Sequence, residues 1–336
     1  MRSPSHVSQR TTLRKNSKLW YTTQGAIVII AGNYAFRVPE EQLRQRAVLF
    51  PLREGRNTDY YEGCRSITLP DSSFDMQAFL LALFNAKFVS GLPKFSFSDP
   101  DTYRVYAGIL KLSRKYGAPY WRRKALHLLS PMFPSTLDHY DRLCAPIPQK
   151  ALDMRAARTA SREVVDAATI ANAKWLLPAA TLYLISSAVS NVSGGPYRLH
   201  PNEGPLSKIY TQYWERHVAR IVAPLSTAPA CTNVDGCSAT LTAFDEEIMT
   251  RHKYELRIVL GKHSAVRERL CGNCALSYEA RYQQLRRKFW AAVPSMFGQE
   301  SWQACIRDMR KDLEENPAFD PVYDREFRTS LVTSLG

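Results

Sequence analysis

The sequence predicts an α+β domain at the N-terminus, followed by a mainly α-helical domain. Two short β-branched runs and a third strand, separated by helical patterns, occupy residues 18–141. From residue 151 onward the apolar residues recur at helical spacing, interrupted by stretches rich in Gly, Pro and Ser. A chain of 336 residues is long enough to form two domains, each with its own core.

The expected divisions follow changes in composition along the chain. Residues 1–17 are polar and basic and are expected to be a disordered leader. Residues 18–141 form the α+β domain, and a Pro-rich linker is expected over 142–150. The helical domain is expected over 151–316, with a C-terminal tail over 317–336.

A β-hairpin is expected to open the first domain. Residues 25–31 are a β-branched run that ends at a Gly-Asn turn, and 34–38 alternate large and small or polar side chains. Pro39 then begins a helix with two acidic residues in its first turn, where they complement the positive end of the helix dipole. Residues 66–69 are the third strand.

The remaining elements are predicted to be helices. In the first domain they span 74–84, 101–117 and 119–129, and the stretch 132–140 closes the unit. In the second domain two helices are expected over 151–189, one over 206–223 and two more over 244–260 and 271–289. The inward residues of the helix 206–223 are expected to be Ile209, Tyr213, Val218 and Ile221.

The chain is strongly basic, with 45 Lys and Arg against 31 Asp and Glu. A net charge of +14 suits an acidic partner, such as nucleic acid, an acidic protein face or an anionic membrane surface, although a solvated basic surface is the more common explanation. The most apolar stretch, 175–189, contains Pro178 and is too short to span a bilayer. Without a secretory signal or a membrane span, a cytoplasmic or nuclear location is expected, and the odd number of cysteines (seven) argues against a disulfide framework.

Four of the seven cysteines form two close pairs. A structural zinc ion needs four thiolates in a tetrahedron, and Cys-x2-Cys lets two sulfurs reach one ion from a tight turn. We expect small residues to permit these turns: Gly272 and Asn273 in the second pair, and Gly236 beside the first. The candidate ligands are Cys231, Cys237, Cys271 and Cys274.

Other interpretations of these cysteines stay open. They are also consistent with ordinary buried thiols, because free Cys is among the most buried residue types. His252 and His263 lie between the pairs and could replace a ligand. A redox Cys-x-x-Cys centre is less favoured, because no thioredoxin-like βαβ pattern surrounds it. Three further cysteines stand alone and are expected to be structural or incidental: Cys64, Cys144 and Cys305.

No catalytic motif stands out in the sequence. It contains no glycine-rich phosphate loop, no His-Glu-x-x-His and no Gly-x-Ser-x-Gly elbow. We therefore expect a protein that is not an enzyme, that has no small-molecule substrate, and whose only cofactor is the candidate structural zinc.

Several motifs of the first domain resemble those of BTB/POZ domains. The run Val28-Ile29-Ile30, followed by Phe36-Arg37-Val38 and then by Leu43 and Phe50, is similar to the opening of that family. The third strand 67–69, the helix ending at Leu83-Phe84 and the segment 110–116 are also similar to its later elements. The segment 133–138 and the run 176–183 resemble the large fungal group of BTB proteins with a helical C-terminal region. Pro39 and Ala47 depart from the residues that many BTB domains carry there.

The resemblance implies a dimerising or adaptor protein that acts through protein–protein interaction. Its expected partners are a second copy of the chain and either a cullin ubiquitin ligase or a transcriptional complex. By analogy, the N-terminal segment, the helix 40–50 and the edge of the strand 25–31 would carry dimerisation. The alternative function is a zinc-dependent, nucleic-acid-binding transcriptional regulator, suggested by the cysteine pairs, the net charge and the basic helix after Cys274.

Overall fold

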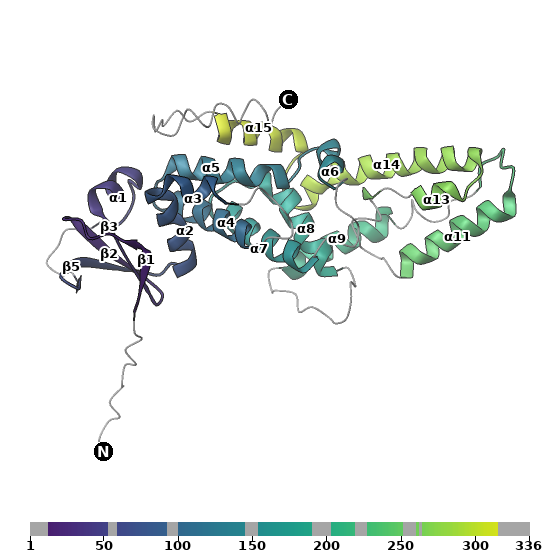
Figure 1. Ribbon diagram of the computed structural model, residues 1–336. Coiled ribbons are helices and arrows are strands. Elements are labelled where there is room, and N and C mark those ends of the chain that lie inside the picture. Colours follow the sequence, from purple (N-terminus) through teal and green to yellow (C-terminus); the bar gives the residue numbers. More distant parts are fainter. Residues whose placement is uncertain are drawn as a thin grey trace, which may run out of the picture. The chain divides into compact units, whose positions relative to one another are not determined.

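The chain folds as an α+β protein in which a five-stranded sheet precedes a long series of helices (Figure 1). The computed structural model describes residues 13–52, 59–92, 100–144, 154–189, 203–218, 227–250, 260–261 and 264–314. Its contacts divide the chain into two units, and each unit is described by itself. The described residues up to 92 and those from 101 to 129 belong to the first unit, and residues 130–312 belong to the second.

The first unit contains the sheet and five helices among its described residues. The strands are β1 (Arg14–Trp20), β2 (Ala26–Ala31), β3 (Tyr34–Pro39), β4 (Asp59–Tyr61) and β5 (Cys64–Leu69). The helices are α1 (Glu40–Arg46), α2 (Ser73–Phe84), α3 (Ala86–Ser90), α4 (Pro100–Lys115) and α5 (Pro119–Leu129). The predicted order of hairpin, helix, strand and further helices is present, with β1, β4 and α3 as additional elements.

Two expectations for this part of the chain are corrected by the structure, and the first is the disordered leader expected over residues 1–17. Residues 14–17 belong to strand β1, which pairs in parallel with β3, so they are not part of a disordered segment. Residues 1–12 of that expected leader lie outside the described residues. Burial along β1 does not alternate strictly, because the two buried residues, Asn16 and Leu19, are three apart. The register of the pairing with β3 shifts between Lys15 and Trp20, and this irregularity accounts for the spacing.

The second correction concerns the strand 25–31, which we expected to offer a free edge. The strand order is β1-β3-β2-β5-β4, so β2 lies in the interior of the sheet. It pairs antiparallel with β3 and parallel with β5, and both of its edges are occupied. Its composition fits this position, since Ile27, Val28 and Ile29 are all at most 2% exposed.

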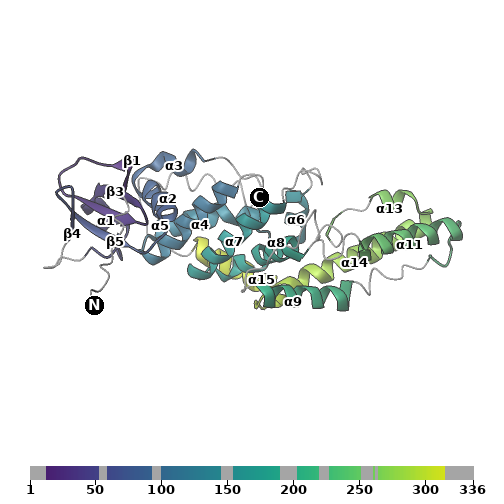
Figure 2. The same cartoon turned by 90° about the horizontal axis from the view of Figure 1, so that it is seen from below.

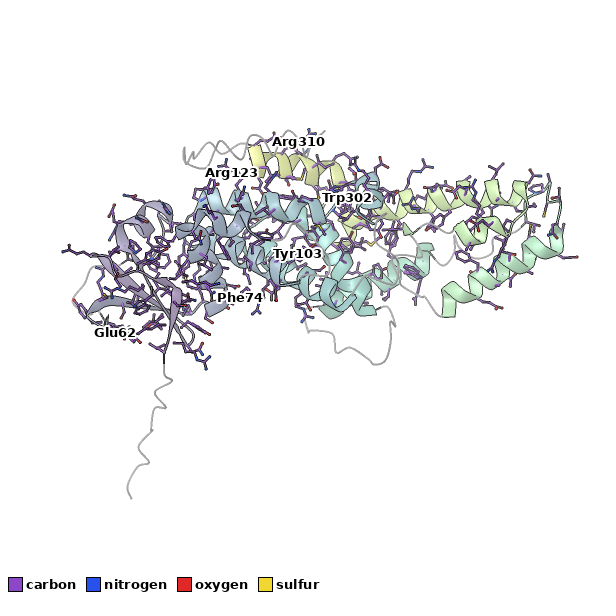
Figure 3. All side chains as sticks on the ribbon, in the orientation of Figure 1. Glu62, Phe74, Tyr103, Arg123, Trp302 and Arg310 are labelled. Carbon is purple, nitrogen blue, oxygen red and sulfur yellow. The ribbon has the colours of Figure 1, made fainter. Side chains whose placement is uncertain are left out.

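The two ends of the sheet approach each other through side chains. Lys15 of β1 forms an ion pair of 2.5 Å with Glu62 in the β4–β5 turn (Glu62 is labelled in Figure 3). The ring of Trp20 meets that of Tyr61 edge to face, at 6.3 Å between ring centroids. The sheet is therefore strongly curled, so that its two outer strands, β1 and β4, approach each other.

Helices α2 and α4 both contribute large side chains to the apolar core of the first unit. Met76, Phe79 and Leu80 of α2 are fully buried, and so is Leu110 of α4. The two helices are held together at their polar margin by the ion pair between Lys111 and Asp75, at 3.0 Å. Burial of this many large apolar side chains is the main stabilising contribution to such a domain.

The second unit is helical throughout its described residues. Its elements are η1 (Ser130–Met132), α6 (Leu137–Cys144), α7 (Met154–Ile170), η2 (Lys174–Leu176), α8 (Leu177–Val189), α9 (Glu203–Tyr213), the π-helical turn η3 (Trp214–Val218), α11 (Val234–Thr250), α13 (Ser264–Glu268), α14 (Gly272–Met296) and α15 (Trp302–Glu314). Helix α14 is the longest of them and runs alongside α11, as Figures 1 and 2 both show.

An aromatic cluster joins α6, α8, α14 and α15. Trp290 stacks on Trp302 at 4.9 Å and also contacts Tyr140, which stacks on Tyr183. Trp302 donates its indole N–H to the carbonyl oxygen of Trp290 at 2.6 Å, so this buried polar group is satisfied. Tyr140 therefore belongs to the helical unit, and the division between the units lies at residue 129/130, before the expected boundary at 141.

The second unit accordingly includes residues 132–140, which we expected to close the first domain. It also includes residues 142–144, the start of the expected linker. Residues 142–144 continue α6, and Asp141 of that helix forms an ion pair with Arg286 of α14, whose side chain is only 4% exposed. Residues 145–153 lie outside the described residues. The expected tail, 317–336, also lies outside them.

The prediction for helix 206–223 placed the wrong residues in the core. Ile209 is 41% exposed, whereas Tyr210 and Trp214 are completely buried. Tyr213 is half-buried and contacts Phe289 of α14. Tyr210 and Trp214 are four residues apart, so their two rings lie on the same face of the helix, and this is the face that is buried. Val218 and Ile221, the other two predicted core residues, have side chains outside the description.

Among the helices that the structure describes, none combines the length and the apolar character that crossing a lipid bilayer requires.

Candidate metal centre

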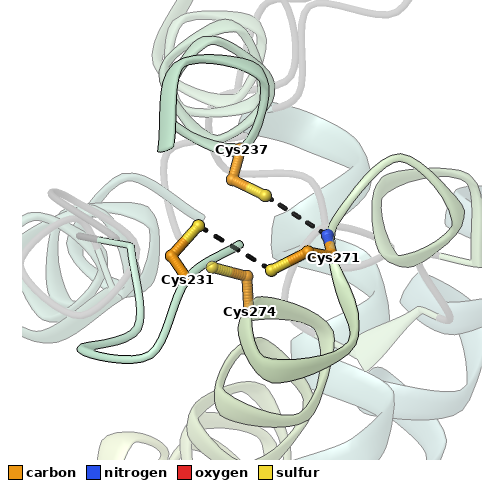
Figure 4. A group of neighbouring side chains, drawn as sticks. All are labelled: Cys231, Cys237, Cys271 and Cys274. Atoms are coloured by element: carbon orange, nitrogen blue, oxygen red, sulfur yellow. Dashed lines mark hydrogen bonds between the residues drawn. The ribbon is translucent and has the colours of Figure 1, made fainter. Parts of the chain in front are cut away.

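The four cysteines that form two pairs in the sequence converge on one point in the second unit (Figure 4). Their sulfur atoms all lie within 4.8 Å of one another, and the Sγ atoms of Cys231 and Cys271 are 3.7 Å apart. Four sulfurs placed about 2.3 Å from a central zinc ion would be about 3.8 Å from each other. Four sulfurs this close together could hold one metal ion.

The first pair is positioned by the N-terminus of α11. Cys231 lies in the preceding loop, and Cys237 lies in the first turns of the helix and is completely buried. Asn233 caps the helix, because its side-chain oxygen accepts the backbone N–H of Gly236 at 3.1 Å. The wide x5 spacing thus spans a loop, a cap and one helical turn, which brings both sulfurs to the same side.

Gly236 is needed in this arrangement for a reason other than the turn that we expected. A Cβ atom at this position would lie 2.4 Å from the side-chain nitrogen of Asn233 and 2.9 Å from its Cγ. The backbone here is helical, so the glycine makes room for the cap. Any larger residue would push the Asn233 side chain away from the helix end.

The second pair is positioned by the N-terminus of α14. Cys271 is the N-cap residue in extended conformation, and Cys274 follows within the first helical turn. The side chain of Asn273 donates to the carbonyl oxygen of Ala230 at 2.6 Å and thereby fastens this turn to the loop that carries Cys231. We expected Gly272 to permit the turn, but a Cβ atom there would have nothing within 4 Å, and its backbone has no special conformation.

Two helix ends and several N–H groups point at the sulfurs. The backbone N–H of Cys271 donates to Sγ of Cys237 at 3.2 Å, and the N–H of Ala228 donates to Sγ of Cys274 at 3.3 Å. Because α11 and α14 both begin at the cluster, the positive ends of their dipoles favour thiolates there.

The two partly exposed cysteines of the cluster differ in pKa. Backbone N–H groups, that of Cys274 above all, lower the pKa of Cys271 to about 5. Loss of hydration, together with the neighbouring cysteine side chains, raises the pKa of Cys231 to about 12. A divalent cation bound by all four sulfurs would override this difference, because a coordinating thiol is deprotonated outright.

The donor set fits a structural ion better than a catalytic one. Catalytic zinc sites keep a position open for water or substrate, whereas four protein sulfurs close the tetrahedron. The set is complete without His252 or His263, which lie outside the described residues. The separate cysteines do not join it: Cys64 lies on β5, and Cys305 is buried in α15. Of Cys144, only the backbone is described.

Sequence reasoning missed the roles of the two asparagines that hold the loops in place: Asn233 was not singled out, and Asn273 was expected only to permit a turn. Asn233 was detectable as a polar residue directly before a helical pattern, which is an N-cap signal. Asn273 was not, because its partner Ala230 lies 43 residues earlier in the chain.

Comparison of the chain with protein-family models, with curated proteins and with solved structures finds no match. The functional assignment therefore depends on the geometry of the cysteine cluster and on the surface and fold of the first unit.

Proposed function

We propose that this chain is a non-catalytic protein–protein interaction module whose first unit is BTB/POZ-like and whose second unit holds one structural zinc ion. The observation that carries the interaction function is an exposed apolar pair in the segment that follows α1. Val48 is 68% exposed and Leu49 is 65% exposed. Large apolar side chains placed side by side on a surface favour contact with another protein.

The backbone beneath this pair is fixed. The N–H of Val48 donates to the carbonyl oxygen of Gly117 at 3.2 Å, and that of Leu49 donates to the carbonyl oxygen of Tyr116 at 3.0 Å. Ala47 and Phe50, on either side of the pair, are buried. The two exposed side chains are thus held on a rigid support, which lowers the entropy lost when a partner covers them.

The order of elements in the first unit supports the BTB/POZ-like assignment. The hairpin of β2 and β3 leads into α1, and β5 then returns parallel to β2 before the helices follow. This is the order of elements on which the resemblance is based. The BTB/POZ-like assignment depends on an analogy of fold and motif, so it suggests a class of partner without identifying a particular one.

Association through α1 is favoured over pairing of strands between protomers. The interior position of β2 removes the edge that we expected to take part. The outer strands of the sheet are β1 and β4. Of these, β1 lies in the N-terminal segment that was expected to take part, and it carries exposed Arg14, Lys15 and Lys18; charged side chains on an edge strand oppose pairing with another strand.

The arrangement of charge near the cysteines gives the nucleic-acid alternative little support. In α13 and the turn after it, exposed Arg267 and Arg269 flank exposed Glu268. On α14, Arg286 is buried in an ion pair with Asp141, which leaves Arg281, Arg287 and Lys288 as the exposed basic residues of that stretch. A surface that binds phosphate groups usually has clustered basic side chains with no acidic side chain, such as Glu268, between them.

The interaction function is tested by sedimentation and by affinity capture from the native cell type. We expect the full chain to form a dimer or to retain a specific partner, and the double variant Val48→Asp/Leu49→Asp to lose that association. Leu276→Asp is the matched control, because Leu276 is 70% exposed but lies on α14. A wild-type chain that stays monomeric and captures no specific protein would overturn the proposal.

The zinc ion is tested by elemental analysis of the purified chain. We expect one zinc per chain and loss of that zinc in the variants Cys237→Ser and Cys274→Ser, because each removes one of four ligands. Cys64→Ser should retain the metal, since Cys64 lies on β5. Equal metal content in all four proteins, or none in the wild type, would contradict the assignment.

A further inference from the structure

The four cysteine residues of the cluster are unequally exposed. Cys237 is completely buried and Cys274 is 3% exposed, whereas Cys231 and Cys271 are both partly exposed. The exposed pair is also close, with 3.7 Å between the sulfur atoms. A diffusing oxidant therefore meets Cys231 and Cys271 first.

The sequence suggests a different pair for oxidation. Cys271 and Cys274 form a Cys-x2-Cys motif at a helix N-terminus, a familiar setting for a redox disulfide. In this structure, however, Cys274 lies beneath the loop of the first pair, where its sulfur accepts the N–H of Ala228. Cys231 approaches the sulfur of Cys271 from a separate segment of chain, on the partly exposed side.

We propose that the cluster is a reversible oxidation site at which a peroxide joins Cys231 to Cys271 and thereby releases the metal. This inference rests on the zinc ion of the proposed function. It adds a regulation of that site, because the ion would be held only under reducing conditions.

The chemistry uses one peroxide and two thiolates. One thiolate sulfur attacks a peroxide oxygen, the O–O bond breaks, a sulfenic acid forms, and the departing hydroxide takes up a proton. The second sulfur attacks the sulfenic sulfur, the S–S bond forms, and a second hydroxide leaves and is protonated. In total, two sulfurs lose two electrons, hydrogen peroxide is reduced to two waters, and two protons are consumed.

The geometry allows this step with a small movement. The distance between the two sulfur atoms must shorten from 3.7 Å to about 2.05 Å. Cys231 lies in a loop and Cys271 is the N-cap of α14, so neither residue is inside a helix that would oppose this movement. The ion then keeps only Cys237 and Cys274 as ligands, and two thiolates do not complete a tetrahedral site. A dithiol reductant reverses the bond by thiol–disulfide exchange and restores all four ligands.

The test begins with the zinc-loaded full chain, whose metal content is measured first. Hydrogen peroxide is added in steps, released zinc is followed with a colorimetric chelator, and the disulfide is located by mass spectrometry of unreduced peptides. We expect one zinc released per chain, a peptide that links Cys231 to Cys271, and recovery of the metal after dithiothreitol and zinc are added.

Several results would overturn the inference. A linkage of Cys271 to Cys274, or any linkage through Cys237, would show that accessibility does not select the pair. Retention of zinc at peroxide concentrations that oxidise the separate, partly exposed Cys64 would show that the cluster is protected. Either result leaves the structural zinc ion intact as a proposal.

Failure of the metal site itself gives a distinct result. If the chain binds no zinc before oxidation, the structural role of the ion is wrong and the release step fails with it. Peptide mapping of that metal-free chain still reports which sulfurs pair. The two proposals are therefore separated by the metal measurement made before peroxide is added.

Discussion

Single side chains decide how the two cysteine loops meet. The cap by Asn233 fixes the start of α11, and the bond from Asn273 to Ala230 fastens the start of α14 to the other loop. Each is one hydrogen bond, and one such bond contributes only about 0.5 to 1.5 kcal/mol to the free energy of unfolding. Their importance lies in position, because both bonds are made within two residues of a metal ligand.

The two glycines near the cysteines give a matched pair of substitutions. Gly236→Ala and Gly272→Ala both remove the conformational freedom of a glycine at a helix start, but only the first places a Cβ against Asn233. We expect Gly236→Ala to be less stable than Gly272→Ala by about 1 kcal/mol, the usual value of an N-cap. Urea unfolding of the zinc-loaded variants measures the difference.

Asn233 itself provides the control for this pair. The variant Asn233→Ala should lose a similar amount of stability, and adding Gly236→Ala to it should then cost little more, because the cap is already gone. Equal stability of the two glycine variants would mean that the close approach of Gly236 to Asn233 is unimportant.

At the scale of elements, the helices near the cysteines have a small core of their own. The described part of α11 buries Cys237 and Leu241 fully and Phe244 almost fully. Phe244 meets Tyr278 edge to face at 5.9 Å, and this contact joins α11 to α14. The C-terminal half of α14, by contrast, contributes Phe289 and Trp290 to aromatic contacts within the larger helical core.

Removal of the metal should therefore loosen only part of the second unit. With a chelator, we expect amide hydrogen exchange to rise in α11, α13 and the first turns of α14, while α7, α8 and the C-terminal half of α14 keep their protection. The physical reason is that few apolar side chains are buried between α11 and the start of α14, so the proposed ion would be the main link between these two helices. Hydrogen exchange with mass spectrometry measures each segment separately.

A different pattern would contradict this account. Uniform loss of protection across the second unit would mean that the metal supports the whole helical core. No change anywhere would mean that the cysteines are ordinary buried thiols, which is the alternative that the sequence left open.

At the scale of the whole molecule, the chain consists of two units with separate cores. The first unit has an interior of aliphatic and aromatic residues around Phe79, and the second has the cluster around Trp290. Each core is built from residues of one unit, so each should respond to its own perturbations.

We expect two thermal transitions in calorimetry, each assigned by one perturbation. A chelator should lower only the transition of the helical unit. Phe79→Ala should lower only the other, by about 3 to 5 kcal/mol in free energy, because Phe79 is completely buried. A single transition that both treatments shift by the same amount would show that the units unfold as one.

The sequence alone predicted the set of candidate ligands and part of the order of elements. Strands β1 and β4 and helices α3, α13 and α15 were not expected, and the helix expected over 244–260 is α11, Val234–Thr250. Both predictions follow from local information: hydrophobic periodicity predicts strands and helices, and the spacing of Cys231, Cys237, Cys271 and Cys274 predicts a shared site. The helix expected over 119–129 coincides with α5, for the same reason.

Only the tertiary structure decided how these elements are used. It placed β2 inside the sheet, moved the division between the units to residue 129/130, and turned Tyr210 and Trp214 inward in place of Ile209. It also made Cys231, and not Cys274, the exposed neighbour of Cys271. Each of these depends on contacts between residues far apart in the chain. A local pattern indicates which side chains are apolar enough to be buried, but it does not indicate which distant residues they pack against.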